Sequence, residues 1–219
     1  MYRGQPLQRW QSLFGRAADV MDAARQQAAR EALYCERVLA KSGSGVVAAV
    51  LGGASPVTAM THYPPGDIFD PDSGAQAYFH AHGAGTGGDG AGDEYGHFHC
   101  FLRPGGLQGP IHHLVALGIN RSGQLVRLFT VNRWVTGDDW LPAEELIALL
   151  PRFDLQLAKP DYLANRWLTA AVALYRGEIQ SLLMERDRAM DMTRLEDRAL
   201  EVLSSRGVDL TATARELRL

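Results

Sequence analysis

Cysteine, excess positive charge and long apolar runs are all scarce in this sequence. Its 219 residues include only two cysteines, Cys35 and Cys100, and carry a formal net charge of −3. Two cysteines make no disulfide framework, and charge of mixed sign argues against nucleic acid or a membrane surface as a partner. The longest apolar run, Gly45 to Gly53, is far shorter than the roughly 20 residues that span a bilayer. With no apolar signal-peptide core after Met1, these features predict a cytoplasmic protein.

The motifs of several large enzyme classes are also missing. The sequence has no Walker A motif, no dinucleotide-binding glycine pattern and no G-x-S-x-G nucleophile elbow. The segment Gly83–Asp93 has six glycines in eleven residues. It links two predicted strands and opens no helix, so it is a poor phosphate cradle. We interpret it instead as a loop that acts as a lid over a neighbouring site.

Apolar periodicity divides the chain into three parts of one expected domain, residues 1–219. Residues 5–41 carry apolar side chains at three- and four-residue spacing, which predicts a helix ending at Ser42-Gly43. Helical periodicity returns over residues 142–219, where Pro142 suits a first helical turn. The helices expected there cover 143–150, 161–190, 195–205 and 210–219.

The middle part, residues 46–136, predicts strands. The expected strands are Val46–Leu51, Ala77–His82, Tyr95–Leu102, His112–Ile119 and Gln124–Val135. Because short connections join several of them, an antiparallel meander is favoured over a parallel sheet. The predicted fold class is therefore α+β, with a small antiparallel β-sheet packed against N-terminal and C-terminal helices.

All seven histidines lie between positions 62 and 113. The strand period of two places His80 and His82 on one face of one strand, and His97 and His99 on one face of the next, together with Tyr95. If the two strands pair as a hairpin, facing side chains stand about 5 Å apart at Cβ. Four imidazoles would then converge, and their desolvation would be costly without a metal or other partners.

The alternating histidines and the nearest carboxylate therefore predict a site for a divalent transition metal, formed by His80, His82, Glu94, His97 and His99. Imidazole and carboxylate ligands suit iron or zinc best, with copper, manganese and nickel as further options. Asp93 is the reserve carboxylate. Glu94, as ligand or general base, and Tyr95 are the candidate catalytic residues.

The remaining candidates carry weaker signals. His112 and His113 are adjacent, so they point to opposite faces of a strand and at most one can join the cluster. His62 lies on a predicted loop, where a structural role and a functional role are equally supported. Asn132 and Arg133 are interpreted as ordinary sheet residues, with substrate contact as the alternative.

One stretch of the sequence resembles an uncharacterised family of bacterial proteins of unknown function. The residues that carry the resemblance are Tyr78-Phe79-His80-Ala81-His82 and Glu94-Tyr95-Gly96-His97-Phe98-His99-Cys100-Phe101. The resemblance extends over most of the chain and implies that this arrangement recurs as a unit. The pair His80 and His82 followed by Glu94 is also similar to the cupin metal motif. Cupins place the carboxylate only a few residues after the second histidine, whereas eleven residues intervene here, so the likeness is one of chemistry and not of descent.

Three functions remain open at this point. The first is a metalloenzyme acting on a small organic molecule, oxidative if the metal is iron and hydrolytic if it is zinc. The second is a non-catalytic metal-binding module, such as a sensor or carrier. The third is a metal-free small-molecule binder with a histidine-lined pocket. Under each of them, the C-terminal helices offer a surface for a homodimer.

Overall fold

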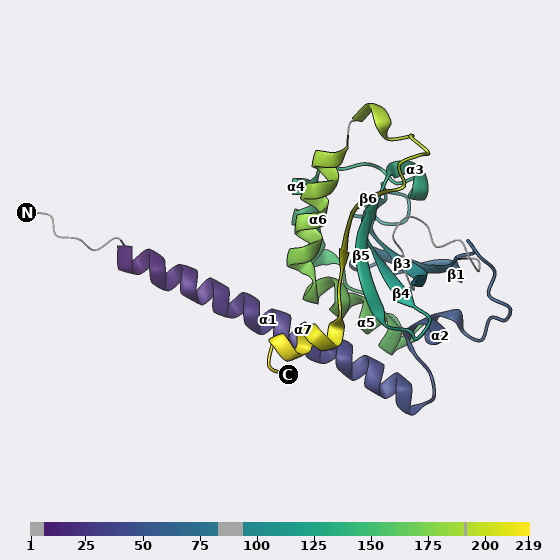
Figure 1. Ribbon diagram of the computed structural model, residues 1–219, viewed down its shortest axis with the longest axis horizontal. Helices are drawn as coiled ribbons and strands as arrows, with labels where there is room; N and C mark the ends of the chain where they lie inside the picture. Colours follow the sequence, from purple (N-terminus) through teal and green to yellow (C-terminus); the bar gives the residue numbers. More distant parts are fainter. Residues whose placement is uncertain (1–6, 83–93, 191) are drawn as a thin grey trace, which may run out of the picture.

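Six antiparallel strands pair in the order in which they occur along the chain. A computed structural model describes residues 7–82, 94–190 and 192–219 (Figure 1). The strands are β1 (Tyr63–Phe69), β2 (Ala75–Ala81), β3 (Glu94–Leu102), β4 (His112–Asn120), β5 (Leu125–Val131) and β6 (Val202–Gly207). The prediction of an α+β fold with an antiparallel meander is therefore confirmed.

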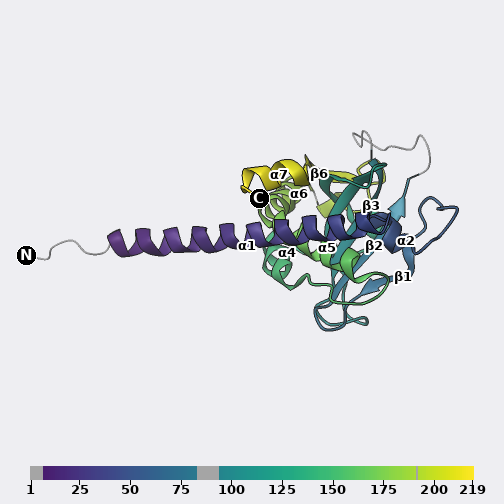
Figure 2. The same cartoon turned by 90° about the horizontal axis from the view of Figure 1, so that it is seen from below.

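Helices from both ends of the chain cover the apolar face of this sheet. The helices of the fold are α1 (Leu7–Lys41), α2 (Val46–Leu51), α3 (Arg133–Thr136), α4 (Ala143–Leu149), α5 (Tyr162–Leu174), α6 (Arg176–Ala189) and α7 (Leu210–Glu216). Of these, α3 lies on the other face, where Val135 packs against Phe129. Helix α5 packs along α1, and α6 packs against β5 and β6. Figure 2 shows the N-terminal part of α1 extending beyond the sheet and the other helices. In the part of the chain that the structure describes, no helix is both long and apolar enough to cross a membrane.

Trp167 of α5 joins the sheet to the long helix. Its side chain is fully buried, and its ring centroid lies 6.2 Å from that of Phe98 on β3. Its indole Nε1 donates a hydrogen bond of 3.0 Å to Oε1 of Glu36 on α1. An aromatic side chain thus fills the core while its one polar group is satisfied, as buried tryptophan requires.

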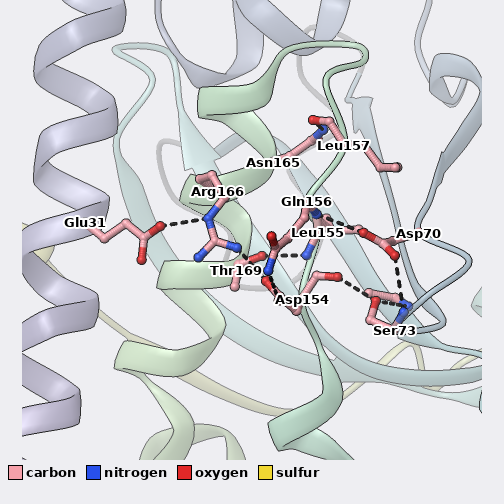
Figure 3. Close-up of polar contacts among 11 residues, drawn as sticks. Glu31, Asp70, Ser73, Asp154, Leu155, Gln156, Leu157, Asn165, Arg166 and Thr169 are labelled. Atoms are coloured by element: carbon pink, nitrogen blue, oxygen red, sulfur yellow. Dashed lines mark hydrogen bonds and ion pairs between the residues drawn. The ribbon is translucent and has the colours of Figure 1, made fainter.

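A polar network ties the turn between β1 and β2 to the segment that precedes α5 (Figure 3). Asp70 accepts hydrogen bonds from the backbone N–H groups of Ser73 and Gln156. Arg166 on α5 forms ion pairs with Glu31 of α1 and with Asp154. These contacts hold one end of the sheet against the helical layer, so the position of β2 is fixed from outside the sheet as well.

The prediction for residues 46–51 is wrong, and the strand over residues 63–69 was not predicted. Val46–Leu51 forms helix α2 and not a strand, because Gly45 is extended before it, Gly52 ends it in the left-handed conformation, and Val46, Val47 and Val50 bury one helical face. A short apolar run does not by itself distinguish the two structures. Tyr63–Phe69 forms strand β1, although Pro64 and Pro65 signal a turn. It is an edge strand whose register is interrupted between Tyr63 and Ile68, which is where a sheet tolerates proline.

The last predicted strand is shorter than expected. β5 ends at Val131, because the Asn132 side chain accepts a hydrogen bond from the Arg133 backbone N–H and caps helix α3. The Asn132 amide also donates to the carbonyl oxygens of Arg194 and Leu200. Asn132 is therefore a structural residue that anchors the segment leading into β6.

The C-terminal part also departs from the prediction at two points. Residues 195–205 were expected to be helical, but Val202–Gly207 forms β6, the partner of β5. Tertiary pairing overrides local propensity here, and the Thr130 and Ser204 hydroxyls share a hydrogen bond of 2.7 Å. The helix expected over 161–190 is interrupted at Tyr175, which separates α5 from α6.

Gly96 of β3 allows the closest approach between β2 and β3. A Cβ atom at this position would stand 2.4 Å from the carbonyl oxygen of His80 and 2.9 Å from Cα of Ala81. We expect Gly96→Ala to lower the free energy of unfolding by roughly 2–3 kcal/mol, because backbone atoms cannot move aside as a flexible side chain can. Gly177→Ala on α6 is the control, since its Cβ would meet nothing within 4 Å. It should stabilise the protein by about 0.5 kcal/mol in urea unfolding. Equal effects of the two changes would contradict this account.

Candidate metal centre

The register of β2 and β3 gathers the histidines on one face of the sheet. The two strands are antiparallel, with His80 opposite His97 and Tyr78 opposite His99. The predicted hairpin of alternating histidines is therefore present. The opposite face carries Phe79 and Phe98, which belong to the main apolar core. Alternation along each strand thus separates a histidine face from an apolar face.

Three imidazole nitrogens of this face converge on one point. Nε2 of His97 lies 2.7 Å from Nε2 of His80 and 3.0 Å from Nε2 of His99. The three side chains are buried, and one ring nitrogen from each histidine lies within 4.8 Å of one from each of the others. Histidine nitrogens that ligate one ion at about 2.0–2.1 Å stand roughly 3 Å apart. These distances therefore suit three ligands of a single metal ion.

The other nitrogen of His97 faces the remaining two predicted ligands. Nδ1 of His97 lies 2.8 Å from Oε1 of Glu94 and 3.0 Å from Nε2 of His82. His82, Glu94 and His97 form a second group whose ligand atoms lie within 4.8 Å of one another. The five predicted residues thus lie together, but as two groups of three that share His97 and use its two different nitrogens.

The protons of the histidine cluster favour the first group as the metal ligands. A neutral imidazole has one N–H and one lone pair. If His97 donates its Nδ1–H to Glu94, its Nε2 lone pair faces both His80 and His99 and can accept only one good hydrogen bond. A metal ion at the convergence point would use all three Nε2 lone pairs at once.

Acceptors stand beside two of the three Nδ1 atoms that would then carry protons. His97 would donate to Glu94, and His99 would donate to Nε2 of His113, which lies 3.0 Å from its Nδ1. Metal-binding histidines commonly donate their second N–H to a carboxylate or another acceptor in this way, which fixes the orientation of the ring.

A bulge in β3 brings Glu94 to the histidine face. Glu94 and His97 are three residues apart and would face opposite sides of a regular strand, but the register with β4 shifts between Glu94 and Gly96. Glycine at position 118 of β4 leaves room for the Glu94 carboxylate, because a Cβ there would stand 2.5 Å from Oε2 of Glu94. The ring of Tyr95 instead packs near Phe79 of the apolar core. The prediction that Tyr95 shares the face of His97 and His99 is therefore wrong.

Burial keeps the clustered imidazoles neutral. Desolvation, followed by the charges of His82 and His62, lowers the pKa of His80 to about 4. Burial also lowers the pKa values of His97 and His99 far below the ordinary value. Neutral imidazole is the form that binds metal ions. The site is therefore prepared for a cation without first having to release protons at neutral pH.

Glu94 has an environment different from that of a surface carboxylate. Its side chain is 3% exposed, and burial raises its pKa to about 7, while Arg127 opposes this shift. Its Oε2 atom is buried without a hydrogen-bond partner in the structure. A carboxyl group with a pKa near neutrality and one uncommitted oxygen has the properties of a general acid or base.

Aromatic rings line the histidine cluster on both sides. Tyr78 lies 5.2 Å from the His99 ring, and the Phe129 ring of β5 lies 4.9 Å from the His97 ring. His62 stacks on Tyr78 at 3.6 Å, and its Nδ1 lies 3.1 Å from a carboxylate oxygen of Asp67. His62 thus covers the edge of the cluster from the segment before β1.

The structure also separates the two adjacent histidines of β4. His113 joins the cluster through His99, whereas Nδ1 of His112 contacts the carbonyl oxygen of Asp139. Cys100 lies in the apolar core, as alternation predicts. Sequence reasoning missed Arg127 and Phe129, because no local motif surrounds them. The proposed lid and the reserve carboxylate Asp93 lie outside the described residues.

The comparisons with known proteins place the chain in a family without assigning an activity. The model of a domain of unknown function (DUF6969) matches residues 26–215, a range that includes the whole sheet and every histidine of the cluster. No curated protein and no solved structure matches the chain. Because the matched range covers most of its length, the chain belongs to the DUF6969 family.

Proposed function

We propose that this protein is a metal-dependent enzyme that binds one divalent transition metal ion through Nε2 of His80, His97 and His99 and acts on a small organic molecule. The observation that carries the proposal is the convergence of these three nitrogens, with acceptors beside the Nδ1 atoms of His97 and His99. Three protein ligands are typical of catalytic metal sites, whereas structural sites usually have four.

The bound metal would supply Lewis acidity if it is zinc and redox chemistry if it is iron. Side chains of the protein would orient the ligands, transfer protons and exclude water. Glu94 orients His97 through Oε1, and its uncommitted Oε2 accepts or returns a proton during the reaction. His113 holds the ring of His99 in place. The aromatic rings of Tyr78 and Phe129 limit the access of water to the site.

Metal content of ligand variants tests the proposal. We expect wild-type protein without a histidine tag to bind about one zinc or iron ion per chain, and His80→Ala and His99→Ala to lose it, because each removes one of three ligands. His82→Ala should retain the metal, since His82 faces the other nitrogen of His97. Elemental analysis after dialysis measures this. His112→Ala, which removes a buried histidine outside the cluster, is the control for folding.

Two results would contradict the proposed site. Wild-type protein that takes up no metal on reconstitution would leave a metal-free pocket as the better interpretation. Loss of metal in His82→Ala, together with retention in His80→Ala and His99→Ala, would place the ion at His82, Glu94 and Nδ1 of His97.

Glu94→Gln tests the part played by the carboxylate. The amide oxygen can still accept the Nδ1–H of His97, but the negative charge is lost. We expect metal affinity to fall by a factor of about 10 to 100, as measured by competition with a chromophoric chelator. Glu36→Gln is the matched control, because Glu36 is a partly buried glutamate that bonds to Trp167 in the helical layer. Unchanged affinity in Glu94→Gln would show that Glu94 does not support the metal through His97.

A further inference from the structure

Arg127 of β5 lies in the same row across the sheet as two of the proposed metal ligands. His80 pairs with His97, His97 pairs with Gly118, and Gly118 pairs with Arg127. Paired residues project from the same side of a sheet, so the arginine side chain emerges on the histidine face. Because position 118 is glycine, the carboxylate of Glu94 can reach into the space between His97 and Arg127.

The side chain of Arg127 is largely buried, and its guanidinium makes an incomplete set of hydrogen bonds. Nε donates to the Ser205 hydroxyl at 2.9 Å, and the group lies 4.2 Å from the centroid of the Phe129 ring. Nη1 lies 3.7 Å from Oε2 of Glu94, which is too far for a hydrogen bond. Among the described residues, neither Nη1 nor Nη2 donates a hydrogen bond, and neither is one of the fully enclosed side-chain atoms that lack a partner, so both remain accessible on the histidine face.

Other shielded arginines of this protein are better partnered. Arg186 bonds through Nε and Nη2 to Asp187 and through Nη2 to the Leu141 carbonyl. Arg166 bonds through Nε to Glu31 and through Nη1 to Asp154. Arg127 differs from both in keeping its two terminal nitrogens available to a ligand on the histidine face.

The geometry also specifies the chemistry of that ligand. A guanidinium presents parallel N–H groups that match the two oxygens of a carboxylate, and it stays charged at any physiological pH. The centroid of the Phe129 ring lies 4.2 Å from the guanidinium carbon and 4.9 Å from the centroid of the His97 ring. A carboxylate held by Arg127 would lie beside Glu94, on the face of the sheet that carries the three Nε2 atoms.

We propose that Arg127 binds the carboxylate of the substrate, so that the small molecule on which the metal site acts is an organic acid. This inference rests on the proposed function for the metal, but the arginine site can be measured separately. Ser205 positions the guanidinium through its bond to Nε, and Phe129 supports the flat face of the group. The carboxylate occupies the two terminal nitrogens and compensates the buried charge.

Titration of cobalt(II)-loaded protein with acetate tests this substrate class. Acetate should shift the visible absorption of the bound cobalt with saturation, and neutral acetamide should not. We expect Arg127→Gln to weaken acetate binding by about 30-fold or more, because a charge-assisted bidentate contact is lost. Arg127→Lys should give an intermediate affinity for acetate, since lysine keeps the positive charge but lacks the two parallel N–H groups of the guanidinium. Arg206→Gln is the control, because Arg206 is an exposed arginine of the neighbouring strand that pairs with Glu185.

The outcomes separate this inference from the proposed metal site. Failure of cobalt to bind the wild-type protein would overturn the metal site. Calorimetry with acetate and metal-free protein would then still test Arg127. If cobalt binds but acetate affinity is equal in wild type and Arg127→Gln, the metal site is supported and the role of Arg127 is overturned. The assignment of a carboxylate would be overturned if inorganic phosphate bound more tightly than acetate. It would also be overturned if Arg206→Gln lost as much acetate affinity as Arg127→Gln. Urea unfolding of each variant identifies any loss of acetate binding that is caused by unfolding alone.

Discussion

The pairing of β2 with β3 in one register is the constraint on which the rest of the site depends. His80 stands opposite His97 only in this register, and the same register sends Phe79 and Phe98 to the apolar core. A shift by one residue would exchange the two faces, burying imidazoles among the helices and leaving the aromatic rings on the polar side. Burial of apolar area therefore selects the register that assembles the proposed metal ligands. Gly96 contributes by allowing the two backbones to approach closely.

The histidine face shows a second constraint, which is the cost of burying polar groups. Imidazoles without partners would be unfavourable in this position, and each of the three central rings has another nitrogen or oxygen atom within hydrogen-bonding distance. Their protons are distributed best when the three Nε2 lone pairs meet a cation. Glu94 and Arg127 then form a pair of opposite charges at the edge of the site, close enough to interact but not hydrogen-bonded to each other. The histidine cluster thus combines three converging imidazole nitrogens with neighbouring donor and acceptor atoms that make no hydrogen bond among the described residues.

Local patterns in the sequence predicted those parts of the fold whose causes are local. The periodicity of α1 predicted its full extent, and alternation predicted the histidine face of β2 and β3. Strand β6 was not predicted, because its stability comes from pairing with β5, which is distant in the chain. The bulge that turns Glu94 toward His97 and Tyr95 away from it depends on the register with β4. Arg127 has no motif around it. Its place beside the histidine cluster follows only from the cross-strand pairing of His97 with Gly118 and of Gly118 with Arg127.

X-ray absorption spectroscopy of the metal-loaded protein tests the central claim most directly. The account predicts a first shell of about three imidazole nitrogens at roughly 2.0–2.1 Å, with the outer-shell scattering of their rings, and no sulfur ligand. Loss of one imidazole in His99→Ala and no loss in His82→Ala would assign the shell to the three converging Nε2 atoms. A shell dominated by oxygen, or one that keeps its imidazoles in His99→Ala and loses one in His82→Ala, would contradict the account.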